Sequence, residues 1–172
     1  MTHPRHGDDL LWGYWATHVT DIRFSPVTHP VYRQLRDLVA GRDHFVMSSN
    51  VDALLARNGF DPDRVFTMQG DYGLYQCETP CTRHPHLPTG RGLQAWLRDA
   101  PADERLLVFD IGSGYNTSRR HPLAHGTSCA RRPNSRLIRI NPQHREVLAR
   151  LAGRAIGTDI GANRLLTALV TT

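Results

Sequence analysis

Short apolar runs alternate with polar, turn-rich segments along the chain, and this alternation predicts both strands and helices. The expected strands are 44–49, 64–68, 106–111, 136–140 and 155–158. The expected helices are 10–19, 31–39 with a stop at Gly41, one around 54–55, 93–99, 144–151 and 162–170. Strands that alternate with helices favour parallel crossovers, so the predicted fold class is α/β, a Rossmann-like parallel sheet with helices on both faces.

Polar side chains follow the first two predicted strands. Ser49, Asn50 and Asp52 come at the end of one strand, and Gln69 comes at the end of the next. Because an open parallel sheet binds its ligand at the carboxyl ends of its strands, we expect a ligand site there. The alternative is that Asn50 and Gln69 are turn and strand-end residues that bond to the backbone.

A glycine-containing turn follows the third predicted strand and contains Gly112, Ser113, Gly114 and Asn116. Two glycines after a strand allow a backbone to approach a dinucleotide, and the same pattern occurs in methyltransferases that bind S-adenosylmethionine. A methyltransferase would normally have an acid at the end of the next strand. Here Asn141 occupies that place, which makes a methyltransferase the less favoured alternative.

The composition limits the function classes. The chain has 172 residues, 40% of them apolar, which is enough for one domain. No apolar stretch approaches the roughly 20 residues of a membrane span, and no secretory segment precedes residue 10, so we expect a soluble, cytoplasmic protein without a membrane partner. No lysine occurs, which excludes lysine Schiff-base chemistry.

Positive charge is unevenly distributed. The net charge is +5, and seven arginines but no acid lie between Ile111 and Arg145: Arg119, Arg120, Arg131, Arg132, Arg136, Arg139 and Arg145. Such a patch suits a pyrophosphate or an acidic partner, with nucleic acid the less favoured partner, or it is a solvated face that keeps the protein dispersed.

Several segments together resemble one enzyme family. They are 49–52 (Ser-Asn-Val-Asp), 69–77 with Pro80 and Cys81, 111–117, 137–141 and 157–160. Their order and spacing resemble the sirtuins, NAD-dependent protein-modifying enzymes, and specifically the macrodomain-associated bacterial class linked to protein ADP-ribosylation. The resemblance implies a single sirtuin-like domain over 1–172, with a helical N-terminal part at 10–42 and a small Cys-containing module at 77–100.

One part of the family pattern is not found. Sirtuins begin with a strand and a Gly-Ala-Gly turn, and no such turn precedes Asn50. We therefore expect a sheet that is incomplete at its first βα unit, since that strand lies centrally in a doubly wound sheet. Each buried backbone group left unpaired costs about 1–3 kcal/mol, so weak or no activity of the chain alone is expected.

The resemblance also implies the cofactor, NAD, and the roles of individual residues. Cleavage of the nicotinamide bond builds positive charge on the ribose, which Asp52 would stabilise, and the amide of Asn50 would hold a water or a ribose hydroxyl. Gln69 stands where deacylating sirtuins have a histidine base. Glutamine cannot titrate, which favours ADP-ribose transfer over lysine deacylation.

The remaining implied contacts are to the adenosine half of NAD. Asn141 would contact the adenosine ribose, and Asp159 and Ile160 lie where the family holds adenine through backbone groups. Asn141 before Pro142 also reads as a simple turn residue. A non-catalytic nucleotide- or ADP-ribose-binding module is the alternative function.

Zinc and the protein partner are further implications. Cys77 and Cys81 form half of a tetrahedral zinc site, but no cysteine follows until Cys129. His84 and His86 would complete a ligand set only if the segment is not extended, and the alternative is that the two thiols are small apolar groups. The partner would be a protein substrate, by analogy a lipoyl-carrier protein.

Overall fold

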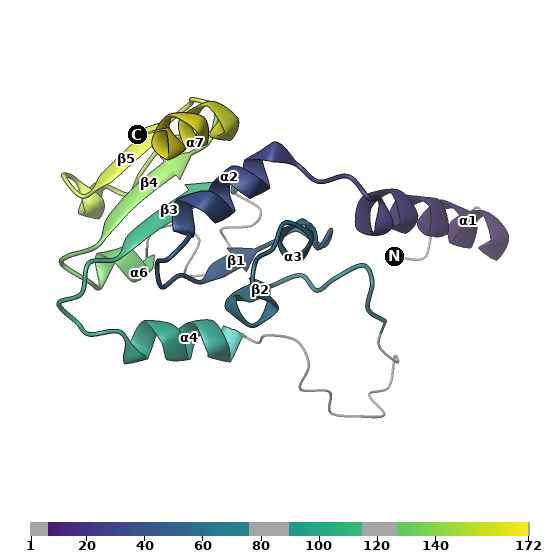
Figure 1. Cartoon of the computed structure of the whole chain (residues 1–172), viewed down its shortest axis with the longest axis horizontal. Helices are drawn as coiled ribbons and strands as arrows, with labels where there is room; N and C mark the ends of the chain where they lie inside the picture. Colours follow the sequence, from purple (N-terminus) through teal and green to yellow (C-terminus); the bar gives the residue numbers. More distant parts are fainter. Residues whose placement is uncertain (1–6, 76–89, 115–126, 172) are drawn as a thin grey trace. The chain divides into compact units, whose positions relative to one another are not determined.

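The computed structural model describes residues 7–75, 90–114 and 127–171 (Figure 1). The chain divides into two compact units. Unit 1 comprises Met1–Arg36 and Gly41–Gln94, and unit 2 comprises Asp37–Ala40 and Ala95–Thr172. Each unit contains one parallel sheet, so each is described by itself.

The sheet of unit 1 has two parallel strands, β1 (Val46–Ser48) and β2 (Val65–Thr67). The crossover between them contains helix α3 (Leu54–Arg57) and the 3-10 helix η2 (Pro62–Arg64). The crossover supplies the buried side chains of Leu55 and Phe60, which form the core of this unit together with Val65 and Leu93. The strands predicted at 44–49 and 64–68 are confirmed, although both are shorter.

Three longer helices begin in unit 1: α1 (Asp8–Val19), α2 (Pro30–Val39) and α4 (Gly90–Asp99). All three were predicted, and Gly41 has the positive φ of +70° that suits the predicted helix stop. The sequence did not predict the π-helix η1 (Thr20–Phe24), which continues α1. None of the described helices is long and apolar enough to span a membrane.

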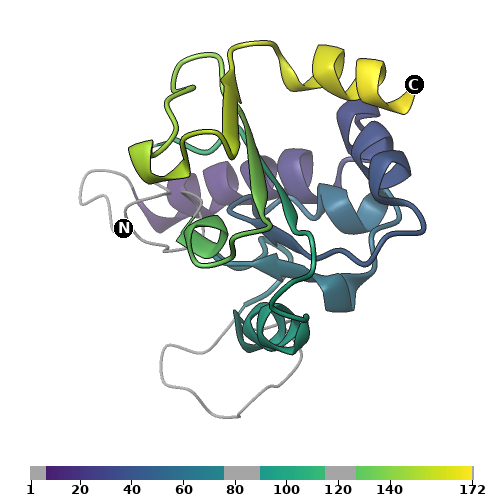
Figure 2. The same ribbon diagram turned by 90° about the vertical axis from the view of Figure 1, so that its left-hand side faces the viewer.

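The sheet of unit 2 has three parallel strands in the order β3-β4-β5, as Figure 1 shows. They are β3 (Leu107–Ile111), β4 (Arg136–Ile140) and β5 (Ala155–Thr158), which Figure 2 shows side by side in teal-green to yellow-green. All three were predicted. Helix α7 (Ala162–Val170) was also predicted, whereas the short α6 (Thr127–Ala130) was not.

The core of unit 2 forms around Cys129, Leu137 and Leu151, which are all buried. Val108 and Val147 pack against this cluster. The cluster therefore joins one face of the sheet to α6 and to the segment before β5.

The helix predicted at 144–151 is wrong. Residues 143–148 are irregular, and the 3-10 helix η3 (Ala149–Leu151) follows. Arg139 Nε donates to the carbonyl of His144 (2.5 Å), and Asn141 Oδ1 accepts from the N–H groups of Gln143 and His144. The His144 carbonyl is an acceptor that the first turn of a helix at 144–151 would need, so the Arg139 hydrogen bond competes with the local helix propensity.

The predicted α/β class with parallel, Rossmann-like sheets and surrounding helices is confirmed. In the described residues β1 pairs with β2, and β3 pairs with β4. The absence of a first βα unit stays a prediction, as does the single-domain organisation. Most of the predicted Cys-containing module at 77–100 lies outside the described residues, and its remainder is α4.

Candidate functional site

In unit 1, two loops leave the same end of the sheet. Because Ser48 pairs with Thr67 in parallel register, the residues after β1 and β2 emerge together. The N–H of Met68 donates to the carbonyl of Ser48 (2.9 Å), and the N–H of Tyr72 donates to the carbonyl of Val51 (3.0 Å). The loop that carries Asn50 and Asp52 therefore lies beside the loop that carries Gln69.

Asn50 and Gln69 are exposed, whereas Ser49 and Asp52 are half-buried. Asn50 Nδ2 donates a hydrogen bond of 3.0 Å to the hydroxyl of Tyr32, which lies in the first turn of α2. Burial, followed by the nearby Asp52 carboxylate, raises the pKa of Tyr32 above its ordinary value, and the Asn50 hydrogen bond lowers it. The Tyr32 hydroxyl therefore keeps its proton to a higher pH than an exposed tyrosine does.

Asp52 has a local structural role as well as a position in the candidate site. Its Oδ1 accepts from the N–H of Leu54 (2.9 Å), which satisfies one of the unpaired donors at the start of α3. The left-handed φ of +53° at Ala53 makes this turn. The carboxylate is therefore fixed at the beginning of the helix rather than swinging freely.

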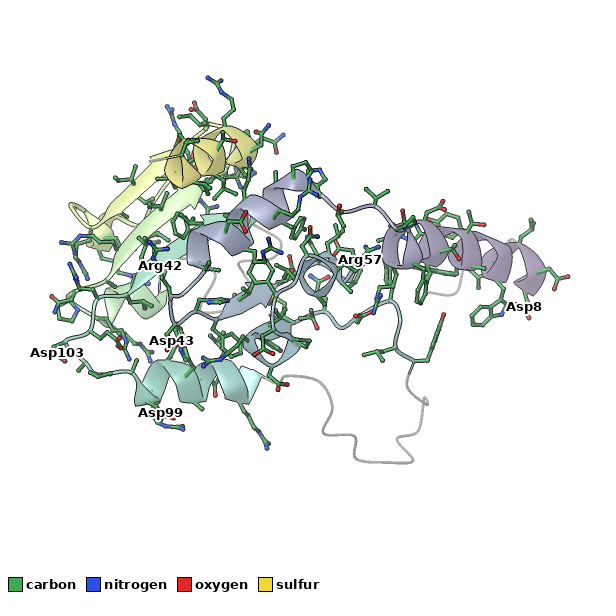
Figure 3. All side chains as sticks on the ribbon, in the orientation of Figure 1. Asp8, Arg42, Asp43, Arg57, Asp99 and Asp103 are labelled. Atoms are coloured by element: carbon green, nitrogen blue, oxygen red, sulfur yellow. The ribbon has the colours of Figure 1, made fainter. Side chains whose placement is uncertain are left out.

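Arg57, labelled in Figure 3, joins three segments of unit 1. Its guanidinium donates to the carbonyls of Asp52 (2.9 Å), Ile22 (3.2 Å) and Ser25. The last two carbonyls lie in and just after η1, so Arg57 ties the π-helix to the loop of Asp52. The sequence did not indicate this role of Arg57, because two of its three acceptors are backbone carbonyls more than thirty residues away.

The loop after Gln69 is held in place by an ion pair. Arg23 Nε contacts Asp71 Oδ1 at 2.5 Å, with side chains 24% and 15% exposed. Asp71 Oδ1 also accepts from the N–H of Gly73 (2.6 Å). This pair connects η1 to the loop of Gln69, as Arg57 connects η1 to the loop of Asp52.

Unit 2 likewise brings its predicted residues to one sheet edge. The N–H of Gly112 donates to the carbonyl of Ile140 (2.9 Å), and that of Asn141 donates to the carbonyl of Thr158 (3.0 Å). The loops that begin at Gly112, Asn141 and Asp159 therefore start at the carboxyl ends of neighbouring strands. Gly112 has φ +71° and open space where a side chain would project, so its backbone is approachable. Asn116 lies outside the described residues.

A buried ion pair supports the glycine turn. Arg139 Nη1 pairs with Asp110 Oδ2, and their side chains are only 3% and 9% exposed. Ser113 donates its hydroxyl to Asp110, and its carbonyl accepts from Arg139 Nη2 (3.0 Å). Charge–charge contact and hydrogen bonds thus fix the turn of Gly112 and Ser113 on both sides.

The side chain of Asn141 is occupied by the protein itself. It is 5% exposed, its Nδ2 donates to the carbonyl of Ser113 (3.0 Å), and its Oδ1 accepts from two backbone N–H groups at 2.9 Å each. Both acceptor positions of the amide oxygen are filled, as the turn-residue interpretation requires. Of the side-chain amide, only the second N–H of Nδ2 is left to make the predicted contact to a ribose.

At the end of β5, Arg145 Nη1 pairs with Asp159 Oδ2 at 3.0 Å, with both side chains largely exposed. The N–H of Ile160 donates to Thr158 Oγ1 (3.1 Å), so this backbone donor already has an acceptor.

The arginine-rich segment does not form one free basic face. Arg139 is buried in its ion pair and Arg145 contacts Asp159. Arg132 donates to the carbonyls at the end of α4: Leu97, Ala100 (3.1 Å) and Pro101 (3.0 Å). Arg131 and Arg136 are exposed, and Arg119 and Arg120 lie outside the described residues. Part of the segment therefore serves the fold.

Cys77, Cys81, His84 and His86 also lie outside the described residues, so zinc binding stays a prediction. In the part of the chain that is described, no group of three or more His, Cys, Asp or Glu side chains is arranged to hold a metal ion. Cys129 is a free, buried thiol whose pKa is raised by burial, and it packs as a small apolar residue.

Two solved structures have a similar fold. A Sir2 homologue with a histidine-to-asparagine mutation, in complex with ADP-ribose, superposes with a TM-score of 0.61 at 16% identity, covering 98% of this chain and 76% of that one. A triple mutant of Sir2 homologues in complex with 2'-O-acetyl ADP ribose gives a TM-score of 0.58 at 16% identity, covering 95% and 73%.

Two curated proteins are similar in sequence over part of their length. A Staphylococcus aureus protein named "Protein ADP-ribosyltransferase" is 32% identical over 98 residues, which is 55% of this chain and 30% of that protein. A probable bifunctional ADP-ribose hydrolase/ADP-ribosyltransferase of Fusarium oxysporum is 37% identical over 77 residues, 43% of this chain and 13% of that protein.

The chain thus spans less than a third of the length of either curated relative. No protein-family model matches the sequence. The structural comparisons show that the chain has the fold of Sir2 homologues, the fold that the sequence predicted.

Proposed function

We propose that the chain is a sirtuin-type protein that binds NAD and ADP-ribose and is related to protein ADP-ribosyltransferases. The observation that carries the proposal is the convergence of the Asn50–Asp52 and Gln69 loops at one end of the β1–β2 sheet. Two similar folds were solved with ADP-ribose or an acetylated form of it, which supports this choice of ligand.

The residues present fit such a ligand. In unit 1, Asn50 offers an exposed amide and Asp52 a carboxylate fixed at a helix start. In unit 2, Gly112, Ser113 and Gly114 form a turn whose backbone can approach a phosphate or sugar, with Asn141 shaping it and Asp159 and Ile160 at the next strand end. We assign the nicotinamide end of the ligand to the first group.

The chemistry would follow from these groups. NAD supplies the ADP-ribose group and nicotinamide as its leaving group. Asp52 would stabilise the positive charge that develops on the ribose carbon, and Asn50 would orient a ribose hydroxyl. Gln69 cannot accept a proton, which favours transfer to a protein nucleophile over deacylation. The acceptor would be a protein, by family analogy a lipoyl-carrier protein, in the cytoplasm.

Calorimetric titration with NAD, ADP-ribose and S-adenosylmethionine tests the ligand class. We expect saturable binding of the first two and none of the third. Binding of S-adenosylmethionine alone would overturn the proposal in favour of a methyltransferase.

Radiolabelled NAD with candidate acceptor proteins tests the reaction. Label on the protein supports the transferase, and we expect weak transfer by the chain alone. Binding of ADP-ribose without any transfer would favour the alternative, a non-catalytic ADP-ribose-binding module.

A further inference from the structure

Tyr32 is a polar residue of unit 1 that the proposed chemistry does not use. It is half-buried in the first turn of α2, and its hydroxyl accepts from Asn50 Nδ2 at 3.0 Å across eighteen residues of sequence. The ring of His29 lies edge-on to the Tyr32 ring, with centroids 6.2 Å apart. The phenol is therefore placed by its own helix and directed at the loop after β1.

This hydrogen bond holds the donor end of the Asn50 amide against the Tyr32 hydroxyl. An asparagine amide has a donor end and an acceptor end, which exchange places when the group rotates by half a turn. With Nδ2 bonded to Tyr32, Oδ1 is left as the acceptor. The N–H of Asn50 donates to Ser48 Oγ (3.1 Å), so the backbone of Asn50 is held as well.

The surroundings of Tyr32 keep its hydroxyl neutral. Burial and the Asp52 carboxylate both disfavour the phenolate and raise the pKa of Tyr32, and a neutral hydroxyl can accept from an amide N–H. Because Asn50 is exposed while Tyr32 is half-buried, a ligand would reach the amide first.

We propose that Tyr32 is a positioning residue of the candidate site. Its hydroxyl holds Nδ2 of Asn50, which leaves Oδ1 as an acceptor for a hydroxyl of the ADP-ribose moiety. This inference rests on the proposed function, because it concerns the same site.

A double-mutant cycle tests the proposal, with the dissociation constant for ADP-ribose measured by calorimetry for Tyr32→Phe, Asn50→Ala and the double variant. Tyr32→Phe removes one hydrogen bond and is expected to weaken binding about tenfold. In the Asn50→Ala background the same change is expected to have less than about a twofold effect, because the residue acts through Asn50.

Tyr75→Phe is the matched control, because Tyr75 is exposed and takes no part in the hydrogen bond between Asn50 and Tyr32. It should bind ADP-ribose as the unchanged chain does. Equal losses from Tyr32→Phe in both backgrounds, or no loss in the unchanged background, would overturn the proposal. Thermal unfolding of all variants separates lost binding from lost folding.

A measurement without ligand keeps the inference separate from the proposed function. The side-chain NH₂ signals of Asn50 in a nitrogen–proton correlation spectrum are identified by their loss in Asn50→Ala. They should move in Tyr32→Phe and stay in Tyr75→Phe. Unmoved signals overturn the inference. If the signals move but the chain binds no ADP-ribose, the proposed function is overturned. The hydrogen bond from Asn50 to Tyr32 is supported in that case.

Discussion

Single side chains in this protein often serve a turn and a candidate site together. Asp52 begins α3 through its Oδ1 and, in the proposed function, stabilises charge on a ribose. Asn141 fills its amide oxygen with two backbone N–H groups while holding the Ser113 carbonyl. An informative substitution at such a residue therefore removes the charge or the ligand contact and keeps the structural hydrogen bond.

Asp52→Asn makes that separation. The amide oxygen can still accept from the N–H of Leu54, so we expect the thermal midpoint to stay close to that of the unchanged chain. Loss of the carboxylate charge should lower NAD turnover by about 10²- to 10³-fold, the size typical of one electrostatic contact in a transition state. Affinity for ADP-ribose, which has no nicotinamide bond to cleave, should change little.

Nicotinamide release measures the turnover, and calorimetry measures the affinity for ADP-ribose. The control is Asp63→Asn, which makes the same change of charge at an exposed position of η2. An unchanged turnover in Asp52→Asn would show that Asp52 serves the fold alone.

The buried Arg139–Asp110 pair gives a stability prediction. Asp110→Asn removes the negative charge beside the buried Arg139 guanidinium. Removal of one partner of a buried pair typically lowers the unfolding free energy by about 3–5 kcal/mol, and we expect a loss of that size. Asp99→Asn, in the exposed pair with Arg98, should cost at most about 1 kcal/mol. Urea unfolding checks both, and similar small losses would contradict a structural role for the buried pair.

At the scale of elements, local sequence predicted every described strand but not the segment before β5. The strand runs are short and apolar, and their pattern needs no distant partner to be recognised. The segment 144–151 has helix-forming residues, but Arg139 on β4 occupies the carbonyl of His144, which the first turn of that helix would need. The π-helix η1 likewise depends on Arg57, which is more than thirty residues away.

The candidate site divides in the same way. The loops of Asn50 and Gln69 were predictable, because parallel strand ends share an edge. The roles of Tyr32, Arg57 and Arg139 were not predictable, because each makes a contact across eighteen or more residues that no sequence pattern indicates. The count of arginines between Ile111 and Arg145 also omits the two acids that pair with them. Asp110 directly precedes this segment, and Asp159 follows Arg145 by fourteen residues.

Gly157 on β5 gives a prediction at this scale. A Cβ at Gly157 would lie 1.8 Å from the carbonyl oxygen of Arg145, a backbone atom that cannot rotate away. Gly157→Ala should therefore separate β5 from the segment before η3 and cost at least about 1–3 kcal/mol of unfolding free energy. Gly13→Ala, with open space in α1, should leave stability equal or slightly higher. Equal midpoints in urea for the two variants would refute the close approach.

On the scale of the whole molecule, each unit contains its own parallel sheet and its own group of predicted ligand residues. Each unit also contains a titratable group whose pKa is raised: Tyr32 in unit 1 and Cys129 in unit 2. In both, burial is the first cause, because it disfavours the charged form. Both groups are therefore expected to lower the unfolding free energy as the pH rises into the alkaline range.

This shared sign predicts how stability depends on pH. The pKa of each group is higher in the folded chain than its ordinary value, 9.0 for Cys129 and 10.0 for Tyr32. Below those values both groups are neutral in both states, and their contribution to stability is fully present. As pH rises through and beyond them, the unfolded chain loses protons first, so the unfolding free energy falls.

The variants Cys129→Ala and Tyr32→Phe each remove one of these groups. We expect each to be less stable than the unchanged chain at pH 7, because Cys129→Ala leaves a small cavity and Tyr32→Phe loses the Asn50 bond. From pH 7 to pH 10, however, each should lose less unfolding free energy than the unchanged chain does. Urea unfolding at both pH values measures the difference. A steeper loss in either variant would mean that burial does not hold that group in its neutral form.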